Sequence, residues 1–194
     1  MTQAKHPIRL IVGLGNPGNQ YNRTRHNVGF WFLDELSSRY RGQFRVEKKF
    51  SGEACQVTLV NQSVWLLKPT TFMNRSGLAV RQLSHFYKIE PESILIVHDE
   101  IDLPSGTTRL KRGGGHGGHN GLRDIIAHLG KTFLRLRLGV NHPSNRADVI
   151  NYVLSNPSKH DEQLIHQDID AAMDVIEWVI KGELEQAMQQ LHSR

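Results

Sequence analysis

Short apolar runs recur along the chain and predict the strands of a β-sheet. They lie at residues 8–14, 57–60, 64–67, 94–97 and 134–140, with a weaker and more polar candidate at 107–111. The polar break Asn61-Gln62-Ser63 separates the second run from the third. Such a break between two strand-length runs indicates a hairpin, so we expect this pair of strands to be antiparallel.

Longer segments between these runs carry apolar residues at helical spacing. They cover residues 28–40, 76–87, 120–129, 147–154 and 159–180, followed by a short final helix with Leu184, Ala187, Met188 and Leu191. The longest segment carries a stripe of Ile165, Ile169, Ala172, Ile176 and Val179, and Gly182 is expected to end it. The first two segments are each expected to bury one face. In residues 28–40 this face contains Phe30, Leu33 and Leu36. In residues 76–87 it contains Leu78, Val80, Leu83 and Phe86.

Strands and helices alternate along the chain, and this order favours an α/β fold. We predict a single domain over residues 1–194, with a mixed, mostly parallel, twisted sheet flanked by helices on both faces. Functional groups in such folds gather in loops beyond the carboxyl ends of strands. This rule selects the loops at residues 16–27, 68–74, 98–102 and 113–120.

Three glycines in the first of these segments imitate a nucleotide-binding loop. Gly13, Gly15 and Gly18 satisfy the spacing G-x-G-x-x-G after an apolar run. However, Pro17 stiffens the turn, and the next helical pattern begins only near Asn27, so no helix follows to face a pyrophosphate. We therefore expect no nucleotide cofactor.

The composition narrows the class of protein. The single cysteine, Cys55, excludes an intramolecular disulfide and indicates a reducing compartment. The longest N-terminal apolar run, residues 10–12 with Leu14, is far shorter than the roughly 20 residues of a membrane-spanning helix, and no signal peptide is evident. We therefore expect a soluble, cytoplasmic protein that does not enter a membrane.

The net charge of +5 is unevenly distributed along the chain. Residues 103–147 carry eight basic residues and one acid, whereas residues 148–194 carry nine acids and three bases. A concentrated basic segment is typical of a surface that binds phosphate backbones. The alternative is a solvated basic face without a partner.

One histidine and one aspartate stand where a hydrolytic pair is expected. His26 lies in a polar loop just before a helix, where a neutral imidazole can accept a proton. Asp99 follows the apolar run 94–97 and can orient that imidazole. Because neither Cys55 nor Ser76 has the context of a nucleophile, the pair points to activation of water. The alternative for His26 is a capping or surface residue.

Two groups of residues have metal-binding character but unsuitable spacing. His98, Asp99, Glu100 and Asp102 are nearly consecutive, so a strand would point them to opposite faces. His116 and His119 form a second candidate pair with no further Cys or His at ligand spacing. We therefore expect no metal.

Three asparagines lie in the selected loops. An amide can donate to a carbonyl and accept from an N–H, so Asn16, Asn74 and Asn120 suit a peptide-like substrate. The local alternative is that Asn74 and Asn120 cap helices and that Asn16 serves the turn before Pro17. The glycine-rich piece 113–118, flanked by Lys111 and Arg112, lets backbone amides approach a phosphate.

Taken in order, the motifs of this chain resemble those of bacterial-type peptidyl-tRNA hydrolases. The resemblance covers nearly the whole chain and rests on five segments: G-L-G-N-P-G with Tyr21 and T-R-H-N-V-G-F (13–30), K-P-x-T-F-M-N-x-S-G (68–77), H-D-E-I-D-L-P-x-G (98–106), G-G-H-G-G-H-N-G-L (114–122) and R-L-R-L-G-V (135–140). It implies a monomeric, metal-independent mixed α/β enzyme without a cofactor. Its implied reaction is hydrolysis of the ester between the peptide and the 3′-terminal ribose of peptidyl-tRNA, which recycles the tRNA.

The resemblance also implies roles for individual residues. By position, His26 is the general base for water, and Asp99 orients and stabilises it. Asn16 contacts the peptide end and helps to distinguish a blocked from a free aminoacyl group. Asn74 and Asn120 bind the substrate and the developing oxyanion.

Further implied roles concern the tRNA. Tyr21 and Phe72 line the site near the acceptor end. Phosphate contacts are expected from four basic residues, Lys111, Arg112, Arg135 and Arg137. Of the last two, Arg135 and Arg137, one is expected to take this role. The chain departs from the family pattern in a shorter loop at residues 130–133 and in Arg123, where a lysine is common. The rival interpretation is a tRNA-binding module without catalysis, which would need the basic segment but not the pairing of His26 with Asp99.

Overall fold

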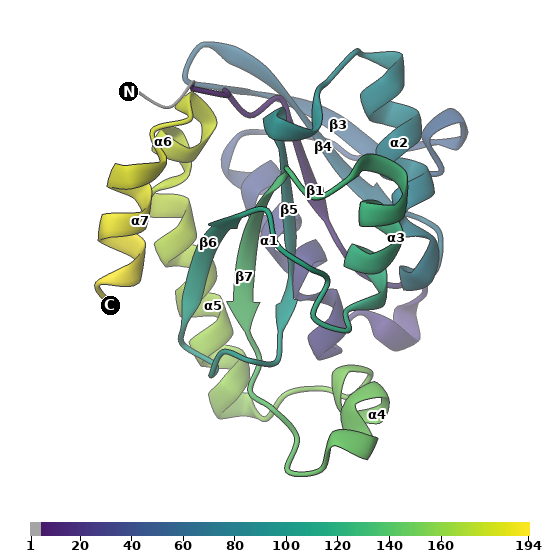
Figure 1. Ribbon diagram of the computed structural model, residues 1–194, viewed down its shortest axis with the longest axis vertical. Coiled ribbons are helices and arrows are strands. Elements are labelled where there is room, and N and C mark those ends of the chain that lie inside the picture. The colour runs from purple at the N-terminus through teal and green to yellow at the C-terminus, as the bar shows by residue number, and fades with distance from the viewer. Residues whose placement is uncertain (1–4) are drawn as a thin grey trace.

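The apolar runs assemble into a seven-stranded mixed sheet in the computed structural model, which describes residues 5–194 (Figure 1). The strand order is β2-β3-β4-β1-β5-β7-β6. The strands are β1 (Leu10–Gly13), β2 (Arg45–Glu47), β3 (Gly52–Leu59), β4 (Gln62–Pro69), β5 (Ile94–Glu100), β6 (Thr108–Arg112) and β7 (Leu134–Gly139). The central strands β4, β1, β5 and β7 are parallel, whereas β3 and β6 run in the opposite direction. The predicted hairpin is confirmed as the antiparallel pair β3 and β4.

Helices cover both faces of this sheet, as predicted (Figure 1). They are α1 (Val28–Arg39), α2 (Ser76–Phe86), α3 (Asn120–Leu129), α4 (Val149–Val153), α5 (Lys159–Asp174), α6 (Ile176–Lys181) and α7 (Leu184–His192). The apolar side chains of α1, α5, α6 and α7 join one core cluster, and those of α2 and α3 join the other. Odd and even positions of β1 divide between the two clusters, because side chains alternate along a strand.

Several boundaries differ from the sequence pattern for identifiable reasons. The segment 159–180 is two helices, because the backbone leaves helical geometry at Val175 (φ −106°, ψ 0°). Both helices still bury their apolar side chains in the same core cluster, so periodicity alone did not reveal the bend. The segment 147–154 forms a 3₁₀ turn, Arg146–Asp148, followed by the short helix α4. Strand β2 was missed because it is a short, largely exposed edge strand.

Two predicted helix faces are partly wrong. Phe30 is only half-buried, and Phe32 takes the fully buried position on α1. On α2, Leu78 is half-buried and Phe86 is 60% exposed, while Ala79 occupies the core. The helices approach the sheet along a slightly different line from the one that large apolar residues suggest.

The glycine segment forms a close contact between β1 and α1. A Cβ on Gly13 would lie 2.3 Å from the carbonyl oxygen of Gly29, so neither residue has room for a side chain there. Gly18 adopts a positive φ of 109°. The chain then continues into the 3₁₀ turn Asn19–Tyr21, and no α-helix follows the glycines directly. The structure therefore agrees with a turn and lacks the helix of a dinucleotide-binding motif.

Two further sequence expectations concern the rest of the described chain. Cys55 lies buried within β3, as a small apolar residue would. Within residues 5–194, no helix has the length and apolar character that crossing a membrane requires. The single-domain prediction began at residue 1, and residues 1–4 lie outside the described part.

Candidate active site

A cavity of about 550 Å³ lies beyond the carboxyl end of β5. Six residues that the sequence selected line it: Asn16, His26, Phe72, Asn74, Asp99 and Asn120. They come from loops far apart in the chain, and the parallel strands bring these loops to the same edge of the sheet. Tyr21 does not line the cavity, but its ring lies edge-on to Phe72 with 6.4 Å between centroids.

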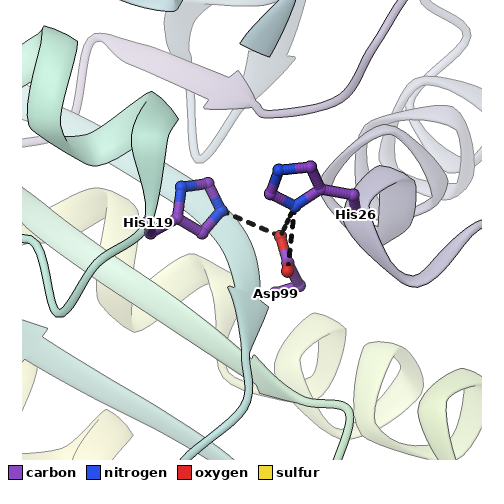
Figure 2. A group of neighbouring side chains, drawn as sticks. All are labelled: His26, Asp99 and His119. Carbon is purple, nitrogen blue, oxygen red and sulfur yellow. Dashed lines mark hydrogen bonds and ion pairs between the residues drawn. The ribbon is translucent and has the colours of Figure 1, made fainter. Parts of the chain in front are cut away.

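His26 and Asp99 form a direct pair in this cavity (Figure 2). The Nδ1 of His26 lies 2.9 and 3.0 Å from the two carboxylate oxygens of Asp99. A carboxylate only accepts hydrogen bonds, so Nδ1 carries the hydrogen and Nε2 keeps its lone pair. Asp99 lies within β5 rather than just after it, because β5 stays paired with β7 as far as Glu100. The imidazole is thus fixed in the tautomer that can accept a proton at Nε2.

His119 is a second histidine bound to Asp99, and sequence reasoning did not select it for this site. Its Nδ1 accepts hydrogen bonds from the backbone N–H groups of Gly121 and Leu122, which begin α3. The opposite nitrogen, Nε2, therefore carries the hydrogen and donates to Asp99 Oδ1 over 2.9 Å. Figure 2 shows Asp99 between the two imidazoles. In the sequence, the only indication of this role was that His119 directly precedes the helical pattern 120–129. Histidine is not among the residues that usually cap helices, so the pattern did not single it out.

The electrostatics of the pair follow from burial and from these hydrogen bonds. Burial by itself raises the pKa of Asp99, but the interactions with His26 and His119 outweigh it and hold the pKa far below the usual range. Burial also lowers the pKa of His26, and the charge and hydrogen bond of Asp99 more than compensate, so its net pKa is raised above 6.5. Asp99 is therefore ionised at neutral pH, and its charge favours the imidazolium form of His26.

His98 is buried next to this pair and is not positioned to act as a base. Burial lowers its pKa to about 3, with His119 and Arg135 contributing in the same direction. Its Nδ1–H donates to the backbone carbonyl of Asp99 over 2.7 Å, and its Nε2 is buried without a partner among the described residues. His98 is only 1% exposed, so it stays neutral and sealed from the cavity.

Asn16 is held in one orientation by its neighbours. Its backbone N–H donates to Asn27 Oδ1 over 2.9 Å, and Asn27 Nδ2 donates to the Asn16 carbonyl over 3.0 Å. The backbone N–H of Met73 donates to Asn16 Oδ1 over 2.7 Å. The acceptor end of the Asn16 amide is therefore occupied, and its Nδ2 hydrogens have no partner within residues 5–194. Asn16 does not merely serve the turn before Pro17, because it joins two loops of the cavity wall.

Asn74 and Asn120 are exposed on the rim of the cavity. The alternative that they cap helices is wrong, since the residue before α2 is Arg75 and the cap of α3 is His119. Asn120 Oδ1 accepts a hydrogen bond from Arg123 Nη1 over 3.1 Å. The Nδ2 hydrogens of both amides thus remain available to a ligand in the cavity.

The four basic residues differ in availability. Lys111 is exposed and forms no ion pair within the described chain. The guanidinium of Arg112 donates to the carbonyls of Glu92 and Thr132. Arg135 is 3% exposed and donates to the carbonyls of two loop glycines, Gly114 and Gly115. Arg137 pairs with Glu100 over 3.1 Å. Of these four residues, only Lys111 has a charged group without a partner within the described chain. Arg135 holds the glycine-rich loop in place by hydrogen bonds.

Neither metal group predicted as an alternative forms in the described chain. Within residues 5–194, the only set of three potential ligands is His26, Asp99 and His119, whose ligand atoms lie within 4.8 Å of one another. His26 Nδ1 and His119 Nε2 carry hydrogens that are donated to Asp99. The three residues therefore form a hydrogen-bonded triad, and a metal ion bound at these two nitrogens would have to displace both protons.

One wall of the cavity is apolar and was not selected from the sequence. Helix α4 contributes Val149, Ile150 and Val153, and Leu154 follows it. Ile150 is 67% exposed and Leu154 is 38% exposed, so both present apolar surface to the open cavity. The lining thus combines three amides with the apolar side chains of α4.

Comparison with known proteins identifies close relatives. A family model described as peptidyl-tRNA hydrolase matches residues 10–194. Peptidyl-tRNA hydrolase of Neisseria meningitidis serogroup A is 53% identical over 188 residues, which cover 96% of this chain and 98% of the relative. That of Alkalilimnicola ehrlichii is 50% identical over the full length of both chains. The crystal structure of peptidyl-tRNA hydrolase from Acinetobacter baumannii at 1.00 Å superposes with a TM-score of 0.94 and 46% identity, covering 97% of this chain and 96% of that one.

Proposed function

This chain belongs to the peptidyl-tRNA hydrolase family, and we propose that it hydrolyses the ester between the peptide and the 3′-terminal ribose of peptidyl-tRNA with water activated by His26. The observation that carries the proposed mechanism is the pairing of His26 Nδ1 with Asp99, which leaves Nε2 as a proton acceptor. The reaction frees the tRNA for another round of aminoacylation.

The chemistry needs one proton acceptor and donors for the developing oxyanion. As water attacks the ester carbonyl, its oxygen bonds to the carbonyl carbon and its proton passes to His26 Nε2. The charge of Asp99 stabilises the imidazolium that forms. The tetrahedral intermediate then expels the ribose 3′ oxygen, which takes the proton back from His26. The side-chain amides of Asn74 and Asn120, on the rim, donate to the negative oxygen of the intermediate.

Asn16 is proposed to recognise the peptide part of the substrate. Its Oδ1 is occupied by the Met73 N–H, so it offers only its Nδ2 hydrogens to a ligand. These hydrogens suit the carbonyl oxygen of an acylated amino group and repel the charged ammonium of a free aminoacyl group. The apolar surface of α4 then accommodates the side chains of the peptide.

The tRNA is proposed to lie along the opposite end of the cavity. Phe72 is 58% exposed there, and its ring together with that of Tyr21 offers an apolar surface to the terminal nucleotide. Lys111 supplies a free charge for a phosphate, whereas Arg112, Arg135 and Arg137 act mainly by shaping the loops around it. Since one chain holds all of these groups, we propose that it works as a monomer. Because its family acts in translation, we also propose that it works in the cytoplasm.

Hydrolysis of a blocked aminoacyl-tRNA tests this function. N-acetyl-aminoacyl-tRNA is incubated with the wild-type protein, with His26→Ala and with His160→Ala, a matched histidine on the exposed side of α5. We expect release of the acylated amino acid by wild type and by His160→Ala. The His26→Ala rate should fall by about 10²- to 10⁴-fold, because the proton acceptor is lost.

Binding measured alongside this assay distinguishes the rival function. A wild-type protein that binds the tRNA but releases nothing would be a tRNA-binding module, and the proposed hydrolysis would be refuted. Full activity of His26→Ala would instead remove His26 from the mechanism.

A further inference from the structure

Arg25, the residue before His26, connects the turn of the catalytic histidine to α4. It belongs to the 3₁₀ turn Arg25–Asn27 and is 8% exposed. Its backbone N–H donates to the carbonyl of Ser155 over 3.1 Å. Its Nη1 lies 3.1 Å from the carbonyl of Tyr152, 3.3 Å from the carbonyl of Ser155 and 2.6 Å from Ser155 Oγ. The guanidinium also lies 3.9 Å from the centre of the Tyr152 ring. A single side chain thus binds the carboxyl end of α4 by hydrogen bonds and by stacking.

The same contacts place α4 relative to the sheet. The Tyr152 hydroxyl donates to the carbonyl of Val140 over 2.6 Å, at the end of β7. The backbone N–H of Val140 in turn donates to the carbonyl of Glu100, at the end of β5. Tyr152 is therefore held between Arg25 and the strand ends that border the cavity.

The charge of Arg25 has no acidic partner in the described part of the chain. Among residues 5–194 it belongs to no ion pair, and its Nε is buried without a hydrogen-bond acceptor there. A guanidinium that meets only carbonyls at a helix end stabilises the exposed C-terminal carbonyls of that helix. A five-residue helix such as α4 has little stability by itself, so it depends on this contact.

We propose that Arg25 is a positioning residue that fixes α4 as the apolar wall for the peptide and so confers a preference for substrates with apolar peptides. This inference rests on the proposed function. Arg25 holds Tyr152 and Ser155, and the wall residues Ile150 and Leu154 are carried on the same short segment. Without Arg25 the wall loses its fixed distance from His26, while the contact between His26 and Asp99 remains.

Steady-state kinetics on two substrates test this role. One is N-acetyl-glycyl-tRNA, which we expect to be too short to reach the wall, and the other carries an N-acetylated leucine tripeptide, which we expect to contact it. For Arg25→Lys, we expect KM for the tripeptide substrate to rise at least about tenfold, the effect of losing one buried apolar contact. For the glycyl substrate kcat/KM should change by less than about threefold, and the pH inflection of His26 should not move.

Matched variants separate positioning from general damage. Ile150→Ala removes part of the wall directly and should give the same selective rise in KM. Ser155→Ala removes one acceptor of Arg25 with little risk to folding and should give a smaller rise in the same direction. Arg23→Ala, an exposed arginine that pairs with Glu162, should behave as wild type on both substrates.

The outcomes are distinct. Equal losses on both substrates in Arg25→Lys and Ser155→Ala, or a fall in kcat with unchanged KM, would show a merely structural role and overturn the inference. A selective effect of Ile150→Ala without one in either of these variants would also overturn it. Inactivity of the wild type on both substrates would instead refute the proposed function itself.

Discussion

Asp99 is buried near the carboxyl end of the central strand β5, and it is ionised because two imidazoles donate hydrogen bonds to it. Burial of an unpaired carboxylate costs several kcal/mol, and such a group normally takes up a proton instead. Here His26 and His119 donate to the same oxygen, Oδ1, over 2.9 Å each. The Nδ1 of His119 already accepts from the start of α3, so His26 Nε2 is the one ring nitrogen of this pair of histidines that keeps a free lone pair.

The pH dependence of the reaction should report this interaction. His26 must be unprotonated to act as a base, and its pKa is raised above 6.5, so kcat/KM should increase as pH rises through an inflection above 6.5. In Asp99→Asn the raising influences are lost and burial remains, so the inflection should move below 6.5. The plateau rate should fall by about 10²- to 10⁴-fold.

Measuring kcat/KM from pH 5 to 9 for both proteins decides this prediction. His142→Asn, a change to another histidine that lines the cavity, is the control for general effects of removing an imidazole. An inflection that stays in place in Asp99→Asn would contradict the assignment of His26 as the titrating base.

At the scale of elements, the close contact of α1 with β1 and β5 positions His26. Gly29 lies on the first turn of α1, three residues after His26. A Cβ on Gly29 would lie 2.5 Å from both the Leu14 nitrogen and the Val97 oxygen, which are hydrogen-bonded to each other. The helix therefore reaches the strand ends only because this position has no side chain.

Gly29→Ala should destabilise the protein by about 1–3 kcal/mol or more, since backbone atoms on both sides must move apart. The hydrolytic rate should fall with it, because the turn that carries His26 shifts. Urea unfolding gives the free-energy change. Gly115→Ala is the control, since its added Cβ meets nothing within 4 Å, and it should stay within about 0.5 kcal/mol of wild type.

At the scale of the whole molecule, the acidic and the basic segment of the chain form different helices and strands. The acidic segment 148–194 forms mainly α5, α6 and α7, on the left of Figure 1, and the basic segment 103–147 forms β6, α3 and β7. A polyanion is attracted toward the basic side, where Lys111 and the glycine-rich loop lie. The acidic helices cover one face of the sheet, where α7 packs against β6 and α5 against β7.

One acidic residue in these helices is buried, and its ionisation should make the free energy of unfolding depend on pH. Asp168 on α5 is 2% exposed, and burial raises its pKa from 3.8 to about 6, against the opposing influence of Arg194, Gly106 and Arg109. The folded state therefore holds this proton more tightly than the unfolded chain. Stability should fall as pH rises from about 4 to 6, by at most about 3 kcal/mol from this group.

Urea unfolding at pH 4, 5, 6 and 7 measures this effect. In Asp168→Asn the fall between pH 4 and 6 should be smaller than in wild type. Asp170→Asn, on the same helix but with a 63% exposed side chain, should retain the wild-type slope. Identical slopes in all three proteins would show that Asp168 titrates normally.

The sequence alone determined most of the elements and the chemical character of the site. Hydrophobic periodicity located α1, α2, α3 and the buried strands, because one face of each element must be apolar to pack. The alternation of these elements indicated the mixed sheet, and the position of loops after strands selected His26 and Asn16. These predictions depend only on the order of a few neighbouring residues, so they can be made from the sequence without knowledge of the tertiary contacts.

Only the tertiary structure decided which side chains meet. The bond between His26 and Asp99 joins residues 73 positions apart, and His119 adds a third loop. The commitment of Arg135 to glycine carbonyls, the break at Val175 and the attachment of α4 by Arg25 likewise depend on neighbours distant in the chain. Periodicity records which face of an element is apolar, but it carries no information on the direction or distance of the partner. That is fixed when the elements pack around the sheet.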